Sequence, residues 1–559
     1  MGSYKGIIFF SLISSLCFSD FEEQRINFLI AKKDYSKAIE WYLENSIKKK
    51  QENPEILFNL AKSIIENSIN STESKDQLLG LYGLMISNSN DVDYDFSKLL
   101  ESKDPQVQML TIQYLSRWNE DVVESWLNKA MSSHYLPVRL QALGSLVTHK
   151  SKLALSHIES LYYRLPNFVR PIFAQYYAAL GTPHSIKILK QMLSDPNREM
   201  KIACILSACQ YGRDDLREDI RKTLSQPDPF VQESAIFAIS HMQDLSSKEL
   251  IESFLDSSHT NLKLASNLGM IQFHDEKALK TIFDLAETGD LFAIFSLGSI
   301  SQSLPTLEKL YNSKDPNVTL NVMAALLEKK HPKAKELLID FLKSHSLYDG
   351  IVPTFSTGKT QHALRLIPAF SKQFSSNKEY INYIQGTTQM IREKFLIQAI
   401  ELPESEFIEI AETIFEHEIF DLIPTLVKLL ENCKSEKTIS MLKKMSQKPG
   451  SPRSRNYSIV ALARMKDPQF INQFIDFISS QKKQDIIDLK TFDTQDESIK
   501  KSTRFLLTPD EKTQLLIEAY DTLIYLHDER CFSVLLSALL QSPAQNRPVL
   551  AGLLLKALL

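Results

Sequence analysis

The chain has 559 residues, more than the roughly 250–300 at which a single hydrophobic core stops growing, so it forms several domains or one elongated array. Apolar residues make up 43% and charged residues 24%, which excludes a globally disordered chain, and the 15 glycines are few for all-β or glycine-loop nucleotide-binding folds. The 64 Lys and Arg against 68 Asp and Glu lack the basic excess that phosphate binding requires, so we expect no nucleic acid among the partners.

Residues 1–19 have the three-part pattern of a signal peptide. Lys5 is followed by an apolar run over residues 6–18, and Ser19 precedes an acidic residue. The run is shorter than the ~20 residues of a membrane-spanning helix, and no later stretch is apolar enough for a transmembrane span. We therefore expect an exported protein that is periplasmic, envelope-associated or secreted. The alternative is a cytoplasmic protein in which this segment is the first buried helix.

Residues 20–100 carry small and aromatic residues at helical spacing. Ala38 and Ala61 would let neighbouring helices approach closely, and Tyr35 and Tyr42 would fill the groove between them. This pattern resembles part of a tetratricopeptide repeat, which implies a helical N-terminal region. An ordinary helical cap for the repeats that follow is the alternative.

Residues 101–345 are predicted to form a repeat array, and from residue 107 to residue 282 the sequence repeats with a period of 31 residues in three columns that stay in phase. The anchor column contains Val107, Val138, Val169, Met200, Val231 and Leu262. Eight residues after the anchors stand Leu115, Leu146, Tyr177, Ala208, Ile239 and Met270. Twenty residues after the anchors stand Leu127, Ile158, Leu189, Ile220, Ile251 and Ile282. Three aligned columns predict a repeat array in which each unit contains two amphipathic helices.

The first helix of a unit is predicted to begin at a turn that contains proline, as in Asp104-Pro105-x-Val107 and Asp228-Pro229-x-Val231-x-x-Ser234-Ala235. Proline is tolerated there because the N–H groups of the first turn have no partner within the helix. These residues resemble the Pro-x-Val-x-x-x-Ala start of HEAT repeats. The resemblance implies an all-α fold, an α-solenoid superhelix of stacked antiparallel helix pairs, and a general adaptor role. In such a stack we expect the second helices to line a concave face.

The remaining sequence is less regular. Residues 346–480 are predicted to be degenerate helical repeats, with an out-of-phase copy at Arg455–Pro468. Residues 481–508 are polar and charged, which is typical of an exposed insertion or loop. Residues 509–559 are predicted to form a C-terminal helical cap. The apolar run that starts at Val549 either packs as a last core helix or docks a partner.

The sequence holds no motif of an enzyme or of a metal site. Thr357-Gly358-Lys359-Thr360 looks like the end of a phosphate-binding loop, but Pro353 stands where that loop needs glycine, so we predict a turn between helices. Zinc-ligand spacings and the Gly-x-Ser-x-Gly turn do not occur. We therefore expect no enzyme activity, no catalytic residue, no cofactor and no bound metal.

Four residues are candidates for contact with a partner. Tyr163 and Tyr176 are candidates because tyrosine buries a large area at little entropic cost. Arg139 and Arg170 occupy a position at which HEAT repeats often carry arginine. The sequence thus predicts an exported, non-enzymatic scaffold whose partners are other proteins. The alternatives are a cytoplasmic HEAT-repeat adaptor or lyase-like enzyme accessory, and a structural component of an envelope or secretion complex.

Overall fold

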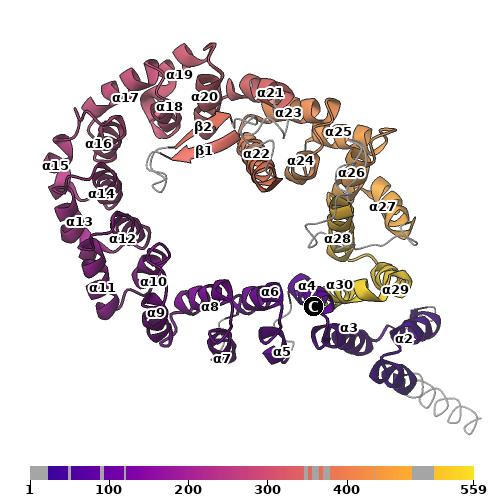
Figure 1. Cartoon of the computed structure of the whole chain (residues 1–559). Coiled ribbons are helices and arrows are strands. Elements are labelled where there is room, and N and C mark those ends of the chain that lie inside the picture. The colour runs from indigo at the N-terminus through magenta and orange to yellow at the C-terminus, as the bar shows by residue number, and fades with distance from the viewer. Residues whose placement is uncertain are drawn as a thin grey trace, which may run out of the picture. The chain divides into compact units, whose positions relative to one another are not determined.

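The computed structural model describes residues 23–47, 52–88, 94–118, 121–344, 351–355, 364–368, 378–433, 435–480 and 509–559. The expected signal peptide, the polar insertion at 481–508 and the Thr357–Thr360 turn lie outside these residues. Within them, no helix combines the length and the apolar character needed to cross a bilayer. The chain divides into unit 1, formed by Met1–His149 and Leu442–Leu559, and unit 2, formed by Lys150–Met441 (Figure 1).

Unit 2 is an α-solenoid of stacked helix pairs, as predicted. Its first helices are α10 (Ile172–Leu180), α12 (Arg198–Gln210), α14 (Pro229–His241), α16 (Thr260–Gln272), α18 (Leu291–Ser296) and α20 (Pro316–Glu328). Its second helices are α9 (Ala154–Tyr162), α11 (Pro183–Leu193), α13 (Arg217–Thr223), α15 (Lys248–Glu252), α17 (Lys277–Glu287), α19 (Leu304–Leu310) and α21 (Ala334–Ser344). Short 3₁₀ turns lie at η2 (Asp214–Leu216), η3 (Leu245–Ser247), η4 (Leu297–Ser299) and η5 (Ser301–Ser303).

The three sequence columns form the core of the array. Every residue of the third column has no exposed surface, and every residue of the second column is buried. In the anchor column Val169 is the exception, since it is half-exposed in the connection that precedes α10. The predicted prolines lie in the first turn of α14 and α20, and Asp228 and Asp315 accept the backbone N–H groups two residues further on. Two other prolines at unit starts lie outside the helices, since Pro166 is in the connection before α10 and Pro196 precedes α12.

A fourth column, which the sequence did not reveal, forms the turn inside each unit. Its residues have left-handed backbone conformations, with φ between 54° and 61°, at the same period of 31 residues. Its members are Lys150, Gly181, Gly212, Gln243 and His274. Glycine adopts this conformation without steric cost, but three of these five positions carry a side chain. A search of the sequence for a glycine repeated every 31 residues would therefore not find this column.

The prediction that the second helices line the concave face is wrong for unit 2. Figure 1 shows α12, α14 and α16 along the inner edge of the curve and α13, α15 and α17 along its outer edge. Small residues explain this. A Cβ added to Gly269 of α16 would lie 3.1 Å from the Ile236 side chain of α14, and one at Gly298, in the turn η4 that follows α18, would lie 3.2 Å from the Cα of Ala325 in α20. Because the first helices pack so closely, their layer follows the shorter arc.

The later part of unit 2 departs from the helical expectation. Strands β1 (Ile351–Phe355) and β2 (Leu364–Pro368) form an antiparallel pair, in which Pro353 lies opposite Leu366. Strand β2 lies against α18 and α20, and β1 lies against α22 (Lys378–Ala399). A proline within a run of β-branched residues disfavours a helix. In β1 the proline is tolerated because both strands of a two-stranded sheet are edge strands. Helices follow at α23 (Glu404–Glu416), α24 (Ile423–Leu430) and α25 (Glu436–Ser446), where the division between the units falls.

Unit 1 combines helices from two distant parts of the sequence. Its first part contains α2 (Tyr35–Tyr42), the π-helix η1 (Leu43–Ile47), α3 (Pro54–Ile69), α4 (Ser74–Ser87), α5 (Ser97–Leu100), α6 (Pro105–Leu115), α7 (Asp121–Ala130) and α8 (Leu136–Thr148). Its second part contains α26 (Pro452–Arg464), α27 (Pro468–Ser480), α28 (Pro509–Leu526), α29 (Cys531–Gln541), the 3₁₀ turn η9 (Ala544–Asn546) and α30 (Arg547–Leu558).

Helix α30 joins these two parts of unit 1. It packs against both α3 and α4, and also against α28 and α29 (Figure 1). Arg547 bridges the parts as well, since its guanidinium donates to the carbonyl of Leu539 and to the hydroxyl of Ser36, 511 residues away in the sequence. The apolar run from Val549 is thus buried as a core helix against the N-terminal helices.

Candidate protein-binding surface

Helices α12 and α14 are each flanked by two other first helices and covered on the outer side by second helices, and α16 packs against α14, α15 and α17, so we place their remaining accessible residues on the inner edge. Along α12 only Leu206 among residues 204–208 is not fully buried, because α10 and α14 flank this helix and second helices cover its outer side. The repeat places Phe237 of α14 and Leu268 of α16 at the same position, and both are also half-buried. We call these three residues the apolar column.

A second accessible column runs parallel to the apolar one. It consists of Gln210, His241 and Gln272, each one helical turn after a member of the apolar column and each exposed. We call these three residues the polar column. Side chains four residues apart on a helix are neighbours, so the two columns form adjacent stripes across α12, α14 and α16.

One contact fixes the orientation of His241 in the polar column. Its Nδ1 donates to the carbonyl oxygen of Phe237 at 2.9 Å, and the two ring centroids lie 4.0 Å apart with the ring planes tilted by 42°. In the neutral imidazole this leaves Nε2 as a hydrogen-bond acceptor. The pair therefore places an accepting nitrogen beside an aromatic ring.

At the N-terminal ends of the helices the surface becomes aromatic and charged. The guanidinium of Arg198 in α12 lies 4.8 Å from the ring centroid of Phe230 in α14, and 40% of the Phe230 residue is exposed. Neither column contains a Lys, Arg, Asp or Glu. Charge lies beside the columns, however, since the buried Glu233 precedes Phe237 by one helical turn on α14.

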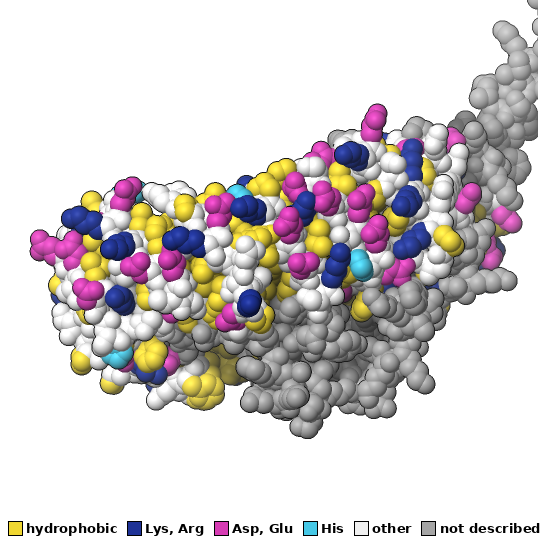
Figure 2. All heavy atoms as spheres, turned by 90° about the horizontal axis from the view of Figure 1, so that it is seen from above, with side chains coloured by type: hydrophobic (Ala, Val, Ile, Leu, Met, Phe, Trp, Pro, Cys, Tyr) yellow, Lys and Arg dark blue, Asp and Glu magenta, His cyan; other side chains and the backbone are white. Residues whose placement is uncertain are grey.

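The second helices carry a different kind of surface. Ion pairs join consecutive second helices or the turns beside them, and they include Lys190–Asp219 at 3.2 Å, Lys309–Glu287 at 2.6 Å and Lys333–Glu308 at 2.6 Å. Figure 2 shows a face on which basic and acidic side chains are interspersed without a field of one sign. Among the residues described on this face, the positive charges form no stripe for phosphate groups.

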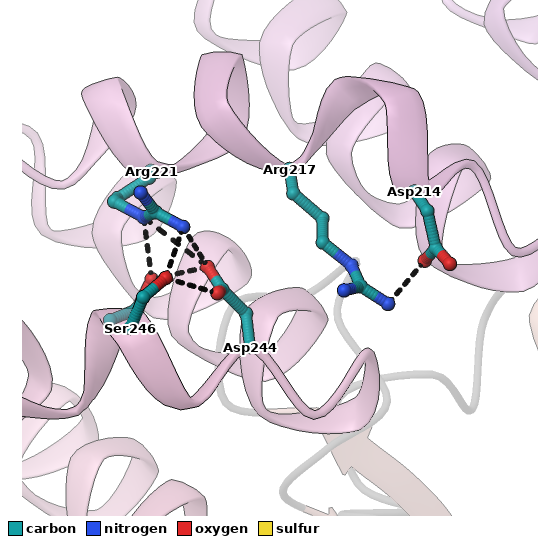
Figure 3. A network of polar contacts seen from close by, with 6 residues as sticks. Asp214, Arg217, Arg221, Asp244 and Ser246 are labelled. Carbon is teal, nitrogen blue, oxygen red and sulfur yellow. Dashed lines mark hydrogen bonds and ion pairs between the residues drawn. The ribbon is translucent and has the colours of Figure 1, made fainter.

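Asp244, in the turn between α14 and α15, accepts hydrogen bonds from three side chains. Arg221 of α13 donates to its Oδ2 at 2.7 and 3.2 Å, and the hydroxyls of Ser246 and Ser247 donate to it at 2.5 and 2.6 Å (Figure 3). Burial alone would raise the pKa of Asp244, but these hydrogen bonds and the Arg221 charge hold the pKa below its usual value. The network joins two successive helix pairs, α12 with α13 and α14 with α15, and we expect it to stabilise the array.

The structure separates the four residues that the sequence singled out. Tyr163 and Arg170 lie in the connection between α9 and α10, on either side of Phe168, and Tyr163 and Phe168 are 77% and 82% exposed. Arg170 braces this connection, since its Nε donates to the carbonyl of Leu165 at 3.0 Å and its guanidinium lies over a tyrosine ring.

The other two candidates are less accessible. Tyr176 is half-buried in α10, packs edge-on against Phe173, and has a pKa raised by burial. Arg139 lies in α8 of unit 1 and is half-buried. Of the four residues, Tyr163 alone is largely exposed.

Sequence reasoning missed both columns of the inner surface. Leu206, Phe237 and Leu268 stand 31 residues apart, as do Gln210, His241 and Gln272, so the period itself could have located them. The structure was needed to show that the first three positions are half-buried and the other three exposed, while their neighbours on the same helices form the core. Within the described residues, no group of three or more His, Cys, Asp or Glu is arranged to hold a metal ion, and the four cysteines there are free thiols.

Comparisons with known proteins add little to this geometry. No protein-family model matches the chain, and no curated protein matches it. A crystal structure of an engineered protein aligns with 88% of this chain and 98% of its own length, at 13% sequence identity and a TM-score of 0.17. A TM-score of that size supports no argument, so the fold rests on the helix pairs themselves and the HEAT and tetratricopeptide resemblances stay predictions.

Proposed function

We propose that this chain is an exported, non-enzymatic scaffold, built from HEAT-like repeats, that binds another protein along the inner surface of α12, α14 and α16. The observation that carries the proposal is the pair of uncharged columns at equivalent positions of three successive helices. A repeat array offers such an extended surface because each unit adds one copy of the same positions.

The chemistry of the surface favours a protein over other partners. Its centre combines half-buried apolar side chains with exposed amide and imidazole groups and contains no cation to hold a phosphate. Protein interfaces have the same composition, an apolar centre depleted of charge with polar groups around it. The Arg198–Phe230 pair at the edge adds two residue types that are enriched at such interfaces.

Site-specific cross-linking in the native cell tests this function. A photo-reactive amino acid placed at Gln210 or Gln272 is expected to cross-link to a defined protein. The same group at Lys280, exposed on α17 of the outer edge, is the matched control and is expected not to do so. Cross-links from Lys280 with none from the inner surface would contradict the proposal.

The proposed export has its own test. The mature amino terminus of the native protein, determined by mass spectrometry after cell fractionation, is expected near Asp20 outside the cytoplasm. An intact Met1 in the cytosol would replace the exported scaffold with a cytoplasmic adaptor, and the inner surface would remain the binding site.

A further inference from the structure

We infer that residues 163–171, the connection between α9 and α10, dock the chain on the surface of a lipid bilayer that contains anionic phospholipids. We call these residues the aromatic loop. Tyr163 and Phe168 would enter the boundary between headgroups and acyl chains, and Arg164 would lie among the phosphates. The aromatic loop is separate from the inner surface of α12, α14 and α16, so the inference goes beyond the proposed function.

Between α9 and α20, the aromatic loop is the longest connection from a second helix to the next first helix. It has nine residues, whereas the corresponding connections between α11 and α20 have three to seven. The period of 31 residues continues unchanged through this unit. The additional loop residues therefore shorten α10, which has 9 residues where α12, α14 and α16 each have 13. About one turn of core helix is replaced by loop.

Hydrogen bonds hold the loop in its conformation. Leu165 is buried, and its carbonyl oxygen accepts a hydrogen bond from Nε of Arg170 at 3.0 Å. The N–H of Val169 donates to the carbonyl oxygen of Pro166, also at 3.0 Å. A loop that is already ordered loses little conformational entropy when it docks, which favours binding.

Two aromatic side chains of the loop are exposed. Phe168 and Tyr163 are 82% and 77% exposed, the largest fractions for any large hydrophobic residue that the structure describes. A phenyl ring that enters the acyl boundary gains the free energy of hydrophobic burial. Tyrosine suits the depth of the headgroups, where its ring lies in apolar surroundings and its hydroxyl reaches water.

The charge of the sequence around the loop is of one sign. Residues 160–194 contain four basic residues and no Asp or Glu, although acidic residues make up 68 of the 559 in the chain. The basic residues are Arg164, Arg170, Lys187 and Lys190. Arg164 and Lys187 are exposed, whereas Lys190 is paired with Asp219 at 3.2 Å. Basic groups beside a bilayer are attracted to anionic headgroups.

Acidic residues stand at both ends of this stretch, and each has a contact within the chain. Glu159 pairs with His184 at 2.9 Å, and Asp195 accepts the backbone N–H of Asn197 at 2.7 Å. The other unit starts that resemble this one place an acidic residue before the proline, as in Asp195-Pro196 and Asp228-Pro229. The aromatic loop has Leu165 at that position, so it lacks the negative charge that anionic lipid would repel.

A bilayer fits these features better than an acidic protein does. An aromatic anchor at a protein interface is enclosed by a matching pocket of the partner. A bilayer takes up exposed aromatic side chains without such a pocket, and its anionic lipids attract the basic residues beside them.

The test measures co-sedimentation with vesicles that contain one phosphatidylglycerol for every two phosphatidylcholine molecules. The chain and its variants are purified from the native cell, so that all have the same mature amino terminus. We expect saturable binding whose partition coefficient falls at least fivefold in the double variant Tyr163→Ser, Phe168→Ser, and at least threefold in Arg164→Glu. These side chains are exposed, so the variants are expected to keep their fold, which circular dichroism checks.

Matched controls come from the same unit. Leu245→Ser removes an apolar side chain that is 63% exposed, and Lys280→Glu reverses an exposed charge on α17. Both are expected to bind as the unmodified chain does. Vesicles of phosphatidylcholine alone are expected to bind the unmodified chain at least fivefold more weakly.

Absence of binding to the anionic vesicles, or binding that either loop variant leaves unchanged, overturns the inference. A photo-reactive amino acid at Phe168 that cross-links in the cell to one protein and not to lipid overturns it too, and assigns the loop to a protein partner. Cross-links from Gln210 and Gln272 test the proposed function separately, so the two can fail independently.

Discussion

Gly83 of α4 and Gly552 of α30 are in direct backbone contact. A Cβ added to Gly552 would lie 2.1 Å from the carbonyl oxygen of Gly83, and one added to Gly83 would lie 2.2 Å from the carbonyl oxygen of Pro548. The atoms met are backbone atoms, so no side-chain rotation can relieve either contact. The two helices meet at this distance because both positions lack a side chain.

Replacing Gly552 with alanine is therefore expected to separate α30 from α4 and to lower the free energy of unfolding of unit 1 by about 1–3 kcal/mol. Trp41, Trp118 and Trp126 are the three tryptophans of the sequence and all belong to unit 1, so tryptophan fluorescence in urea reports on this unit. Leu559→Ala, at a residue that is 64% exposed, is the control and is expected to leave the midpoint unchanged. A normal midpoint for Gly552→Ala would refute the contact.

The column of left-handed turns gives a second prediction. Gly212 has a φ of 60° and no heavy atom lies within 4 Å of its added Cβ, so Gly212→Ala tests the backbone alone and is expected to cost about 1 kcal/mol. Gly181→Ala is expected to cost more, because its Cβ would lie 2.2 Å from the guanidinium of Arg213, which donates to the carbonyl of Ala178. Urea unfolding followed by far-ultraviolet circular dichroism measures both. Equal losses would show that the Arg213 contact is unimportant.

Asp244 gives a prediction about pH. Its pKa is lower in the folded chain than the ordinary value of 3.8, so the ionised carboxylate stabilises the fold above that value and the stabilisation is lost as the pH falls below it. Asp244→Asn is expected to cost roughly 1–3 kcal/mol at pH 7 and progressively less towards pH 2–3, by urea unfolding at each pH. Asp256→Asn, at a fully exposed side chain, is expected to have little effect at either pH. A loss that does not vary with pH would contradict the role of the charge.

An ion pair joins α26 to α28. The guanidinium of Arg453 donates to both oxygens of Glu511 at 2.9 and 2.6 Å, and its side chain is 3% exposed. Glu511→Ala is expected to cost about 2–4 kcal/mol, because the buried guanidinium loses its carboxylate. The double change Arg453→Met with Glu511→Leu is expected to recover most of this loss, since it removes both charges. Tryptophan fluorescence measures both, and a double variant no more stable than the single one would argue against a penalty from the buried charge.

The sequence predicted the array because hydrophobic burial repeats with the helix pairs. The column from Leu127 to Ile282 is buried without exception, since each member lies between the two layers of helices. Curvature was not predictable in the same way. It depends on how closely the first helices approach, which small residues such as Gly269 decide through contacts with the next unit.

Two other features have no local signal in the sequence. Positions 150, 243 and 274 adopt left-handed turns with Lys, Gln and His, so the residue type does not show the conformation. The position of α30 depends on helices that are distant in the sequence. From the sequence alone its apolar run was compatible with a core helix or with a partner-binding surface, and the backbone contact between Gly83 and Pro548 shows that it is a core helix. The polar column was equally hidden, because an exposed glutamine is ordinary on any helix.

The bridge from Arg547 to Ser36 has a consequence for biosynthesis. Ribosomes add about 5–20 residues per second, so the 511 residues between these side chains take roughly half a minute to two minutes to synthesise. During that interval the apolar sides of α3 and α4 that receive α30 are made but uncovered, while unit 2, which is continuous in sequence, can already fold. The apolar surface of α3 and α4 therefore stays exposed to aggregation until α30 has been synthesised. A translation arrest before Arg547 would release a product in which unit 2 is folded and this N-terminal surface is still exposed.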